Sequence, residues 1–307
     1  MRKIIGIGET ILDILFSENK PFAAIPGGSA FNAMVSLGRL NVSACFVGET
    51  GDDKVGHIIR SFMEENNLSA DYLDLNQDLK SAVSLAFLND KNDAEYVFFK
   101  DYHQTRFDNV FPKIEADDIV LFGSYYALNP VLRPRMLDFL DMARNSGAII
   151  YYDINFRKSH ENEVVRLSTT FIENYEYADI IRGSEDDFRY LYKMTDSEKL
   201  YHEKIKYYTP YFIYTAAEQG AQVWGNNFYK HYQAKPVKTV CTVGAGDSFN
   251  AGFLFGLLNA RIRRSDLPTL KERDWDAIVK CGLDFAAEVC QTHNNYISKQ
   301  FAEGYLI

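Results

Sequence analysis

The sequence contains few cysteines and no arrangement of them that would hold a fold together. There are four in 307 residues, and no two form a C-x-x-C pair. Three of them sit inside apolar runs, which favours buried free thiols over a disulfide framework or a zinc site. This usage is typical of a reducing compartment. The cysteines are Cys45, Cys241, Cys281 and Cys290.

Long apolar runs are also missing. No stretch approaches the length that a membrane-spanning helix needs. The first residues, MRKIIGIGETILDILF, begin with charge and turn apolar, but Glu9 and Asp13 interrupt the run too early for an export segment. We therefore expect a cytoplasmic protein with no membrane partner.

Basic clusters are absent as well. The chain has 33 Lys and Arg against 42 Asp and Glu, a net charge of -9, and a pI near 5.2. Its densest basic stretch, residues 261–264, is short. Neutralising phosphates along a nucleic acid needs clustered cations, so we expect no nucleic-acid partner. The chain also lacks G-x-x-x-x-G-K-[ST], HRD and DFG, which argues against P-loop kinases and protein kinases.

The sequence does contain an alternating pattern of strand-like and helix-like segments, and 47% of its residues are hydrophobic, which is enough for a large core. Short apolar runs alternate with amphipathic segments of helix length, which predicts a mostly parallel sheet covered on both faces. No repeat or Pro/Gly-rich linker divides the chain, so we expect one domain over residues 1–307. The predicted strands are 4–8, 44–48, 119–123, 149–153, 179–182, 212–215 and 222–224, and the predicted helices are 31–40, 55–66, 130–146, 161–175, 185–194 and 246–259.

Two segments do not follow this alternating pattern. Residues 10–25 are extended without helical periodicity, and residues 82–99 hold two β-rich runs around the polar turn 89–93, a hairpin signal. Together they predict a small antiparallel sheet that serves as a lid over a pocket or as a dimer contact. The alternative is a surface loop without function.

Residues 242–253, TVGAGDSFNAGF, combine a glycine-rich turn with the start of an apolar helix. Apolar groups surround the helix that begins near residue 246, so it should be buried, with its free amides forming an anion site. Asp247 lies at that end, where Asp also serves as a simple helix cap. The helix dipole should lower the pKa of Asp247. A carboxylate beside an anion site suits removal of a proton from a hydroxyl that attacks phosphorus.

A second motif, PGGSAFNAMVSLGRL at residues 26–40, leads from a Gly-Gly turn into a helix that carries Asn32. This early GG-x-x-x-N together with the late GAGD resembles the two signatures of the ribokinase-like (PfkB-type) carbohydrate kinases, with wording closest to fructokinases. The resemblance runs from about residue 3 to residue 287 and implies a three-layer α/β sandwich. It extends to GETILD at 8–13, FVGETGDDKVG at 46–56 and DINFR at 153–157.

The resemblance also implies roles for individual residues in an ATP- and Mg²⁺-dependent sugar kinase. Asp247 would be the general base, beside an anion hole made by the amides of Gly244, Ala245, Gly246 and Asp247. Residues implied to bind the sugar are Asp13, Gly28, Asn32 and Arg157. Residues implied to lie near the nucleotide are Asn155, Glu185, Asp187, Thr215 and Gly220.

Three positions depart from the family pattern. Cys241 stands where an aspartate is usual, and Ala217 replaces a glycine of T-x-G-x-x-G. The N-x-x-E motif is read as Ser184 to Asp187, with Glu185 as another candidate, so the metal ligands stay open. These changes motivate an alternative function, a sugar- or nucleotide-binding regulatory protein with weakened catalysis.

Fructose is the first acceptor to test, and other acceptors remain open. A ketosugar acid or a phosphorylated sugar would need cations in the pocket, and a nucleoside would need an aromatic platform. A homodimer through the lid is the expected assembly. The cations available for an anionic acceptor are Lys91, Lys100, Arg106 and Arg157.

Overall fold

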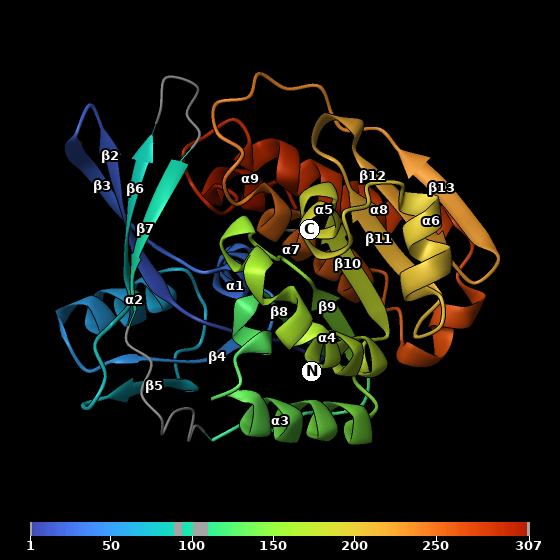
Figure 1. The fold of residues 1–307 in the computed structure, drawn as a ribbon, viewed down its shortest axis with the longest axis horizontal. Helices are drawn as coiled ribbons and strands as arrows, with labels where there is room; N and C mark the ends of the chain where they lie inside the picture. Colours follow the sequence, from blue (N-terminus) through green and yellow to red (C-terminus); the bar gives the residue numbers. More distant parts are fainter. Residues whose placement is uncertain (1, 89–93, 101–109, 306–307) are drawn as a thin grey trace.

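The computed structural model describes residues 2–88, 94–100 and 110–305 and contains two separate sheets. The larger has nine strands in the order β13-β12-β11-β10-β9-β8-β1-β4-β5 (Figure 1). Strands from β5 to β11 in this order run parallel, and β12 and β13 add an antiparallel hairpin at one edge. The strands are β1 (Ile4–Ile7), β4 (Ala44–Gly51), β5 (Leu73–Asn76), β8 (Ile119–Gly123), β9 (Ile149–Asp153), β10 (Ile180–Ser184), β11 (Tyr211–Thr215), β12 (Ala221–Gly225) and β13 (Phe228–Tyr232).

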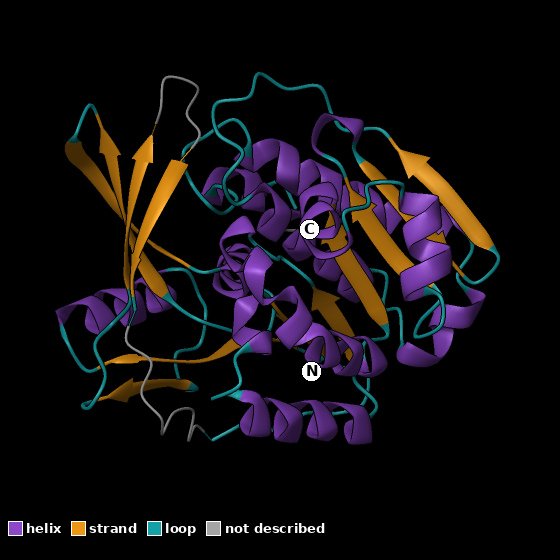
Figure 2. Ribbon diagram, in the orientation of Figure 1, coloured by secondary structure: helices purple, strands orange, loops and turns teal. Residues whose placement is uncertain are grey.

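Successive residues of each central strand enter different cores. Ile4 and Tyr151 belong to one hydrophobic cluster, and their neighbours Ile5 and Tyr152 belong to the other. Helices therefore cover both faces, and the predicted three-layer α/β sandwich is confirmed (Figure 2). One face holds α1 (Ser29–Arg39), α2 (Lys54–Glu65), α7 (Ala245–Asn259), α8 (Glu272–Val289) and α9 (Lys299–Glu303), and the other holds α3 (Arg133–Ser146), α4 (Val164–Tyr177), α5 (Glu185–Tyr192) and α6 (Ser197–Leu200).

The second sheet has four strands in the order β3-β2-β6-β7 and stands beside the main body on the left of Figure 1. The predicted small sheet is present, but it is antiparallel only in part, because β2 and β6 pair parallel. Two antiparallel hairpins meet at that central parallel pair. The predicted turn at residues 89–93 lies outside the described residues. The strands are β2 (Ile11–Ser17), β3 (Lys20–Gly27), β6 (Val83–Leu88) and β7 (Ala94–Phe99).

Short helical turns complete the fold, and several elements were not predicted. The strands β5 and β13 and the long helix α8 all lie outside the predicted ranges. None of the four cysteines forms a disulfide. Within the described residues, every helix is too short or too polar to cross a lipid bilayer. The turns are η1 (Tyr125–Leu128), η2 (Lys158–Glu163), η3 (Tyr201–Ile205), η4 (Ala217–Gln219) and η5 (Arg264–Thr269).

Candidate active site

Helix α7 is buried, and its N-terminus opens at the edge of the sheet where the parallel strands end. Gly244 precedes the helix with φ of 79°, and a Cβ there would come within 2.6 Å of the Asn295 backbone. Glycine is therefore required for this tight entry. The Ala245 amide already donates to the Thr242 carbonyl at 3.2 Å. This leaves Gly246 and Asp247 as the first-turn amides best able to serve a ligand.

Asp247 lies against helix α1, which carries the other signature segment. Asn32 Nδ2 donates to one carboxylate oxygen at 2.8 Å, and Ser29 Oγ donates to the other at 2.9 Å. Asp247 is 8% exposed, so its carboxylate is almost fully buried next to these two donors. Helices α1 and α7 pack together and bring these residues into contact.

Burial raises the pKa of Asp247 to about 6, although the hydrogen bond from Asn32 lowers it. Asp153 raises this pKa further, and Arg157 and Ser29 lower it. The lowered pKa predicted from the helix dipole is therefore wrong in direction. Loss of solvation outweighs the first-turn dipole for a carboxylate buried this deeply. The carboxylate is mostly ionised at neutral pH and can still accept a proton.

Asp13, on β2 of the small sheet, lies close to the same polar side chains. A Cβ added to Gly27 would lie 2.8 Å from Asp13 Oδ2, 3.4 Å from Asn295 Nδ2 and 3.6 Å from Asn32 Oδ1. Three polar side chains therefore converge around one glycine. Ser84 hydrogen-bonds to Asp13, and burial raises the pKa of Asp13 to about 6.

Two further features suit this polar cluster, which comprises Asp13, Asn32, Asp247 and Asn295, to hydroxyl groups. Asn32 Oδ1 is buried and accepts no hydrogen bond from the described residues. Gly28 begins α1 with φ of 130°, and a Cβ there would come within 2.2 Å of the Glu9 carbonyl. Asn295 belongs to this polar cluster but was not singled out in the sequence, because it lies in a polar loop with no motif.

A buried polar network lies behind the first turn of α7. Arg182 Nη1 donates to Asp153 Oδ1 at 2.9 Å, and Nη2 donates to Thr215 Oγ1 at 2.7 Å. Asn250 Nδ2 donates to Asp153 Oδ2 at 2.8 Å, and the Tyr151 hydroxyl donates to Asn250 Oδ1 at 2.9 Å. Sequence reasoning missed Arg182 and Asn250 as site residues. The available signals were an arginine ending a buried strand and an asparagine inside an apolar helix.

The segments after β9 and β11 border the same edge of the sheet. Arg157 is exposed, and its charge acts on both Asp13 and Asp247. Asn155 has φ of 37° and Ala217 has φ of 38°, a left-handed backbone that L-residues rarely adopt. Gly220 has φ of 84°, and a Cβ there would come within 2.1 Å of the Tyr232 carbonyl.

The two acidic residues predicted near the nucleotide are both engaged by other groups. Asp187 Oδ1 accepts from the Phe156 amide at 2.6 Å, and Oδ2 accepts from the Ser184 amide and hydroxyl. Glu185 pairs with Arg189. In the part of the chain that the structure describes, no group of three or more His, Cys, Asp or Glu could hold a metal ion. Asp187 and Glu185 therefore do not form a metal site made of protein side chains alone.

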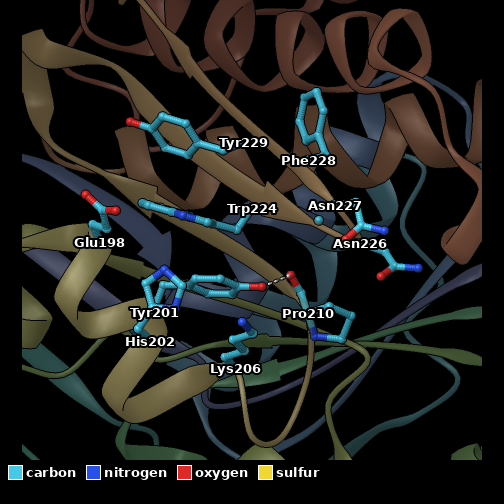
Figure 3. A pocket seen from close by; sticks show the side chains of 11 residues that line it. Glu198, Tyr201, His202, Lys206, Pro210, Trp224, Asn226, Asn227, Phe228 and Tyr229 are labelled. Carbon is cyan, nitrogen blue, oxygen red and sulfur yellow. Dashed lines mark hydrogen bonds between the residues drawn. The ribbon is translucent and has the colours of Figure 1, made fainter.

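A hollow of about 550 Å³ lies elsewhere and contains none of the predicted site residues (Figure 3). Its aromatic walls include Tyr201, Trp224 and Tyr229. Trp224 pairs with Phe212 near the start of β11, whereas Thr215 lies at the end of that strand. The hollow therefore sits toward the opposite end of β11 from the network around Asp247.

Comparison with protein families decides the identity of the chain. The family model described as "pfkB family carbohydrate kinase" matches residues 1–301. The chain belongs to this family. It is therefore a phosphotransferase whose acceptor is a carbohydrate hydroxyl, and the resemblance inferred from the two signature motifs is confirmed.

Curated pfkB-family relatives include plant fructokinases. "Probable fructokinase-6, chloroplastic" from Arabidopsis thaliana is 25% identical over 288 residues, covering 88% of this chain and 73% of the relative. Fructokinase-2 from Solanum habrochaites is 25% identical over 285 residues, covering 88% and 86%. These identities are too low to carry a particular acceptor across to this chain.

Solved structures of pfkB-type kinases share the fold across nearly the whole chain. Aminoimidazole riboside kinase from Salmonella enterica, in complex with aminoimidazole riboside and an ATP analog, has a TM-score of 0.79 and 22% identity, with 100% of both chains covered. A double mutant of fructokinase from Vibrio cholerae, with fructose, ADP and potassium ion bound, has a TM-score of 0.85 and 18% identity, covering 100% and 99%. Fructokinase from Xylella fastidiosa with bound ATP has a TM-score of 0.83 and 17% identity, covering 98% and 97%.

Proposed function

We propose that this pfkB-family protein is an ATP-dependent sugar kinase, with fructose as the first acceptor to test. The observation that carries the proposal is the contact of Asp247 with Asn32 beside Asp13, at the N-terminus of a buried helix. This contact supports the proposal, because the proposed base, the polar cluster and the first-turn amides lie close to one another. The curated fructokinase relatives support the choice of fructose as the first acceptor.

In the proposed reaction, Asp247 takes the proton from an acceptor hydroxyl. The hydroxyl oxygen forms a bond to the γ-phosphorus of ATP as the bond between that phosphorus and the β–γ bridging oxygen breaks, and ADP leaves. The amides of Gly246 and Asp247 stabilise the charge on the transferring group. Gly244 forms the turn that presents them, and the Ala245 amide donates to Thr242 instead. Asp13 and Asn32 hold the acceptor, and Gly28 allows it to approach the backbone.

The nucleotide is proposed to lie along the ends of β9 to β11, near Asn155, Thr215 and Gly220, with Arg157 facing the phosphates or the sugar. Mg²⁺ enters this proposal as MgATP, held mainly by phosphate oxygens and water, because Glu185 and Asp187 are engaged elsewhere. The chain is proposed to work as one domain in the cytoplasm, with residues 10–25 and 82–99 as its lid.

The test is release of ADP from MgATP across a panel of sugars, with Asp247→Asn as the matched variant. We expect turnover with at least one sugar and a loss of roughly 10²–10⁴-fold in the variant, the usual contribution of a general base. Unchanged nucleotide binding by the variant would serve as the control for folding. A variant as fast as the wild type would exclude Asp247 as the base.

Two other acceptor classes have support and belong in the panel. Lys100 pairs with Glu9 at 2.7 Å, and its charge acts on Asp13, so a cation is available for a ketosugar acid. The similarity to aminoimidazole riboside kinase favours a nucleoside-like acceptor. Thermal stabilisation by a sugar without any ADP release would instead support a binding or regulatory protein.

We also propose that the lid pairs with the lid of a second copy. Asp13 and Ser84 are paired across β2 and β6, so they lie on the same face of the small sheet, the face that carries Asp13 toward the polar cluster. Ile14, Leu85 and Val97 follow one another across β2, β6 and β7 on the other face. Val97 is 45% exposed and Phe99 is 58% exposed, and an apolar sheet face of this kind favours a partner surface.

A further inference from the structure

Arg182 is a buried cation in the middle of β10, beside Asp153 at the end of β9 and next to the first turn of α7. The residue is 6% exposed. A Cβ added to Gly246 would lie 3.0 Å from Arg182 Nη2, so the glycine lets the guanidinium reach the helix backbone. Arg182 Nη2 also donates to Thr215 at 2.7 Å, which ties β10 to β11. The guanidinium therefore contacts the helix turn that provides the proposed anion hole.

The counter-ion of Arg182 lies one turn further along the same helix face. Asp153 accepts from Arg182 and from Asn250, and Asn250 follows Gly246 by four residues on α7. The Arg182 guanidinium thus lies beside Gly246, and the Asp153 carboxylate lies beside Asn250, one turn further along the helix. The dipole of the ion pair has the same direction as the helix dipole, with its positive end at the N-terminus.

We propose that Arg182 is a positioning residue for phosphoryl transfer, which fixes β10 and the ends of β9 and β11 against the first turn of α7 and adds positive potential to the anion hole. This inference rests on the proposed kinase activity. Charge that develops on the transferring phosphoryl group is stabilised by preorganised donors and dipoles in a site that excludes water. Arg182 provides that preorganisation from behind the helix, without touching either substrate.

The alternative is that the ion pair is only structural, and two variants separate these roles. Arg182→Met leaves the Asp153 carboxylate buried without its cation, so it should destabilise the fold. It should also move the acid limb of the pH–rate profile upward, because Asp153 raises the pKa of Asp247. The double variant Arg182→Met/Asp153→Asn removes both charges, so stability and the acid limb should return toward wild type.

The decisive measurements are kcat and the affinity for ADP with aluminium fluoride, a mimic of the transferring phosphoryl group, against ADP alone. In the double variant we expect kcat to stay about tenfold to a hundredfold low, somewhat less than the loss of a direct oxyanion donor. The preference for the aluminium fluoride complex should fall by a similar factor, while ADP binds nearly as in the wild type. Recovery of wild-type kcat and preference in the double variant would overturn the inference.

Arg182→Lys provides a second test should the double variant fail to fold. It keeps the charge but loses the forked donor, so it should retain more of the aluminium fluoride preference than Arg182→Met. Equal loss in both variants would overturn the role of the charge. If the wild type turns over no sugar but still binds ADP with aluminium fluoride more tightly than ADP alone, only the assignment of the acceptor is overturned. A wild type without the preference would overturn the inference about Arg182.

Discussion

Asn32 Nδ2 donates a hydrogen bond to Asp247 Oδ2 at 2.8 Å, between residues 215 positions apart in the chain. This bond joins the early and the late signature segment of the family. Because the amide donor stabilises the ionised carboxylate, it partly offsets the rise in the pKa of Asp247 that burial causes. The contact therefore tunes the protonation of the proposed base as well as its position.

The first prediction follows from that bond. The pH profile of kcat/KM in the wild type should show an acid limb near pH 6, where Asp247 loses its proton. Asn32→Leu removes the donor, so the pKa of Asp247 should rise and the limb should move to higher pH. The profile is measured with saturating MgATP and varied sugar. A limb that stays in place would show that another group controls it.

The second prediction concerns stability. Asp13 and Asp247 both have pKa values raised to about 6 by burial, so the folded protein binds more protons than the unfolded chain between about pH 4 and 6. Their ionisation therefore lowers the free energy of unfolding as pH rises through this window. Asp247→Asn removes that cost and should stabilise the protein by on the order of 1–3 kcal/mol at pH 7.5.

Urea unfolding of wild type and Asp247→Asn at pH 7.5 and pH 4.5 tests this. The stabilisation should shrink at the lower pH, where the native carboxyl is already protonated. Asp284→Asn is the opposite control. Burial acts to raise the pKa of Asp284, but its bonds with Lys280, Lys235 and Tyr305 outweigh this and lower it. Asp284 therefore stabilises the protein at neutral pH, and the change to Asn should destabilise it there.

The third prediction concerns Ala217, which stands where family members usually have glycine. Its φ of 38° is strained for any residue with a Cβ. Ala217→Gly should relieve about 1 kcal/mol of strain, partly offset by the greater freedom of glycine in the unfolded chain. Thermal unfolding should show a small rise in Tm. Gly220→Ala is the contrasting variant and should be strongly destabilising, since its Cβ would collide with the Tyr232 carbonyl.

The fourth prediction concerns the lid. If its outer face joins two copies, Val97→Lys together with Phe99→Lys should convert a dimer to a monomer, measured by light scattering after gel filtration. Tyr207→Lys is a matched control because Tyr207 is 83% exposed and lies outside the lid. A wild type that is monomeric at all concentrations would exclude the dimer and leave the lid only as a cover for the polar cluster.

Local sequence patterns predict the α/β layering and the two signature segments. Alternating short apolar runs and amphipathic helices depend on residues close together in the chain, so periodicity was enough to predict them. It predicted the hairpin at residues 82–99 for the same reason, but it gave residues 10–25 only as extended. It could not predict that β2 and β6 pair parallel, because that pairing joins residues such as Asp13 and Ser84 from separate hairpins.

The electrostatics of the site depend on how the folded chain packs. The dipole of α7 is a local property and suggested a lowered pKa for Asp247, but burial by the surrounding elements raises it. The ion pair of Arg182 with Asp153 was equally invisible, since it forms only when β9 and β10 pair side by side in the observed register. Solvation and long-range charge depend on what the whole chain brings together, and no local pattern records them.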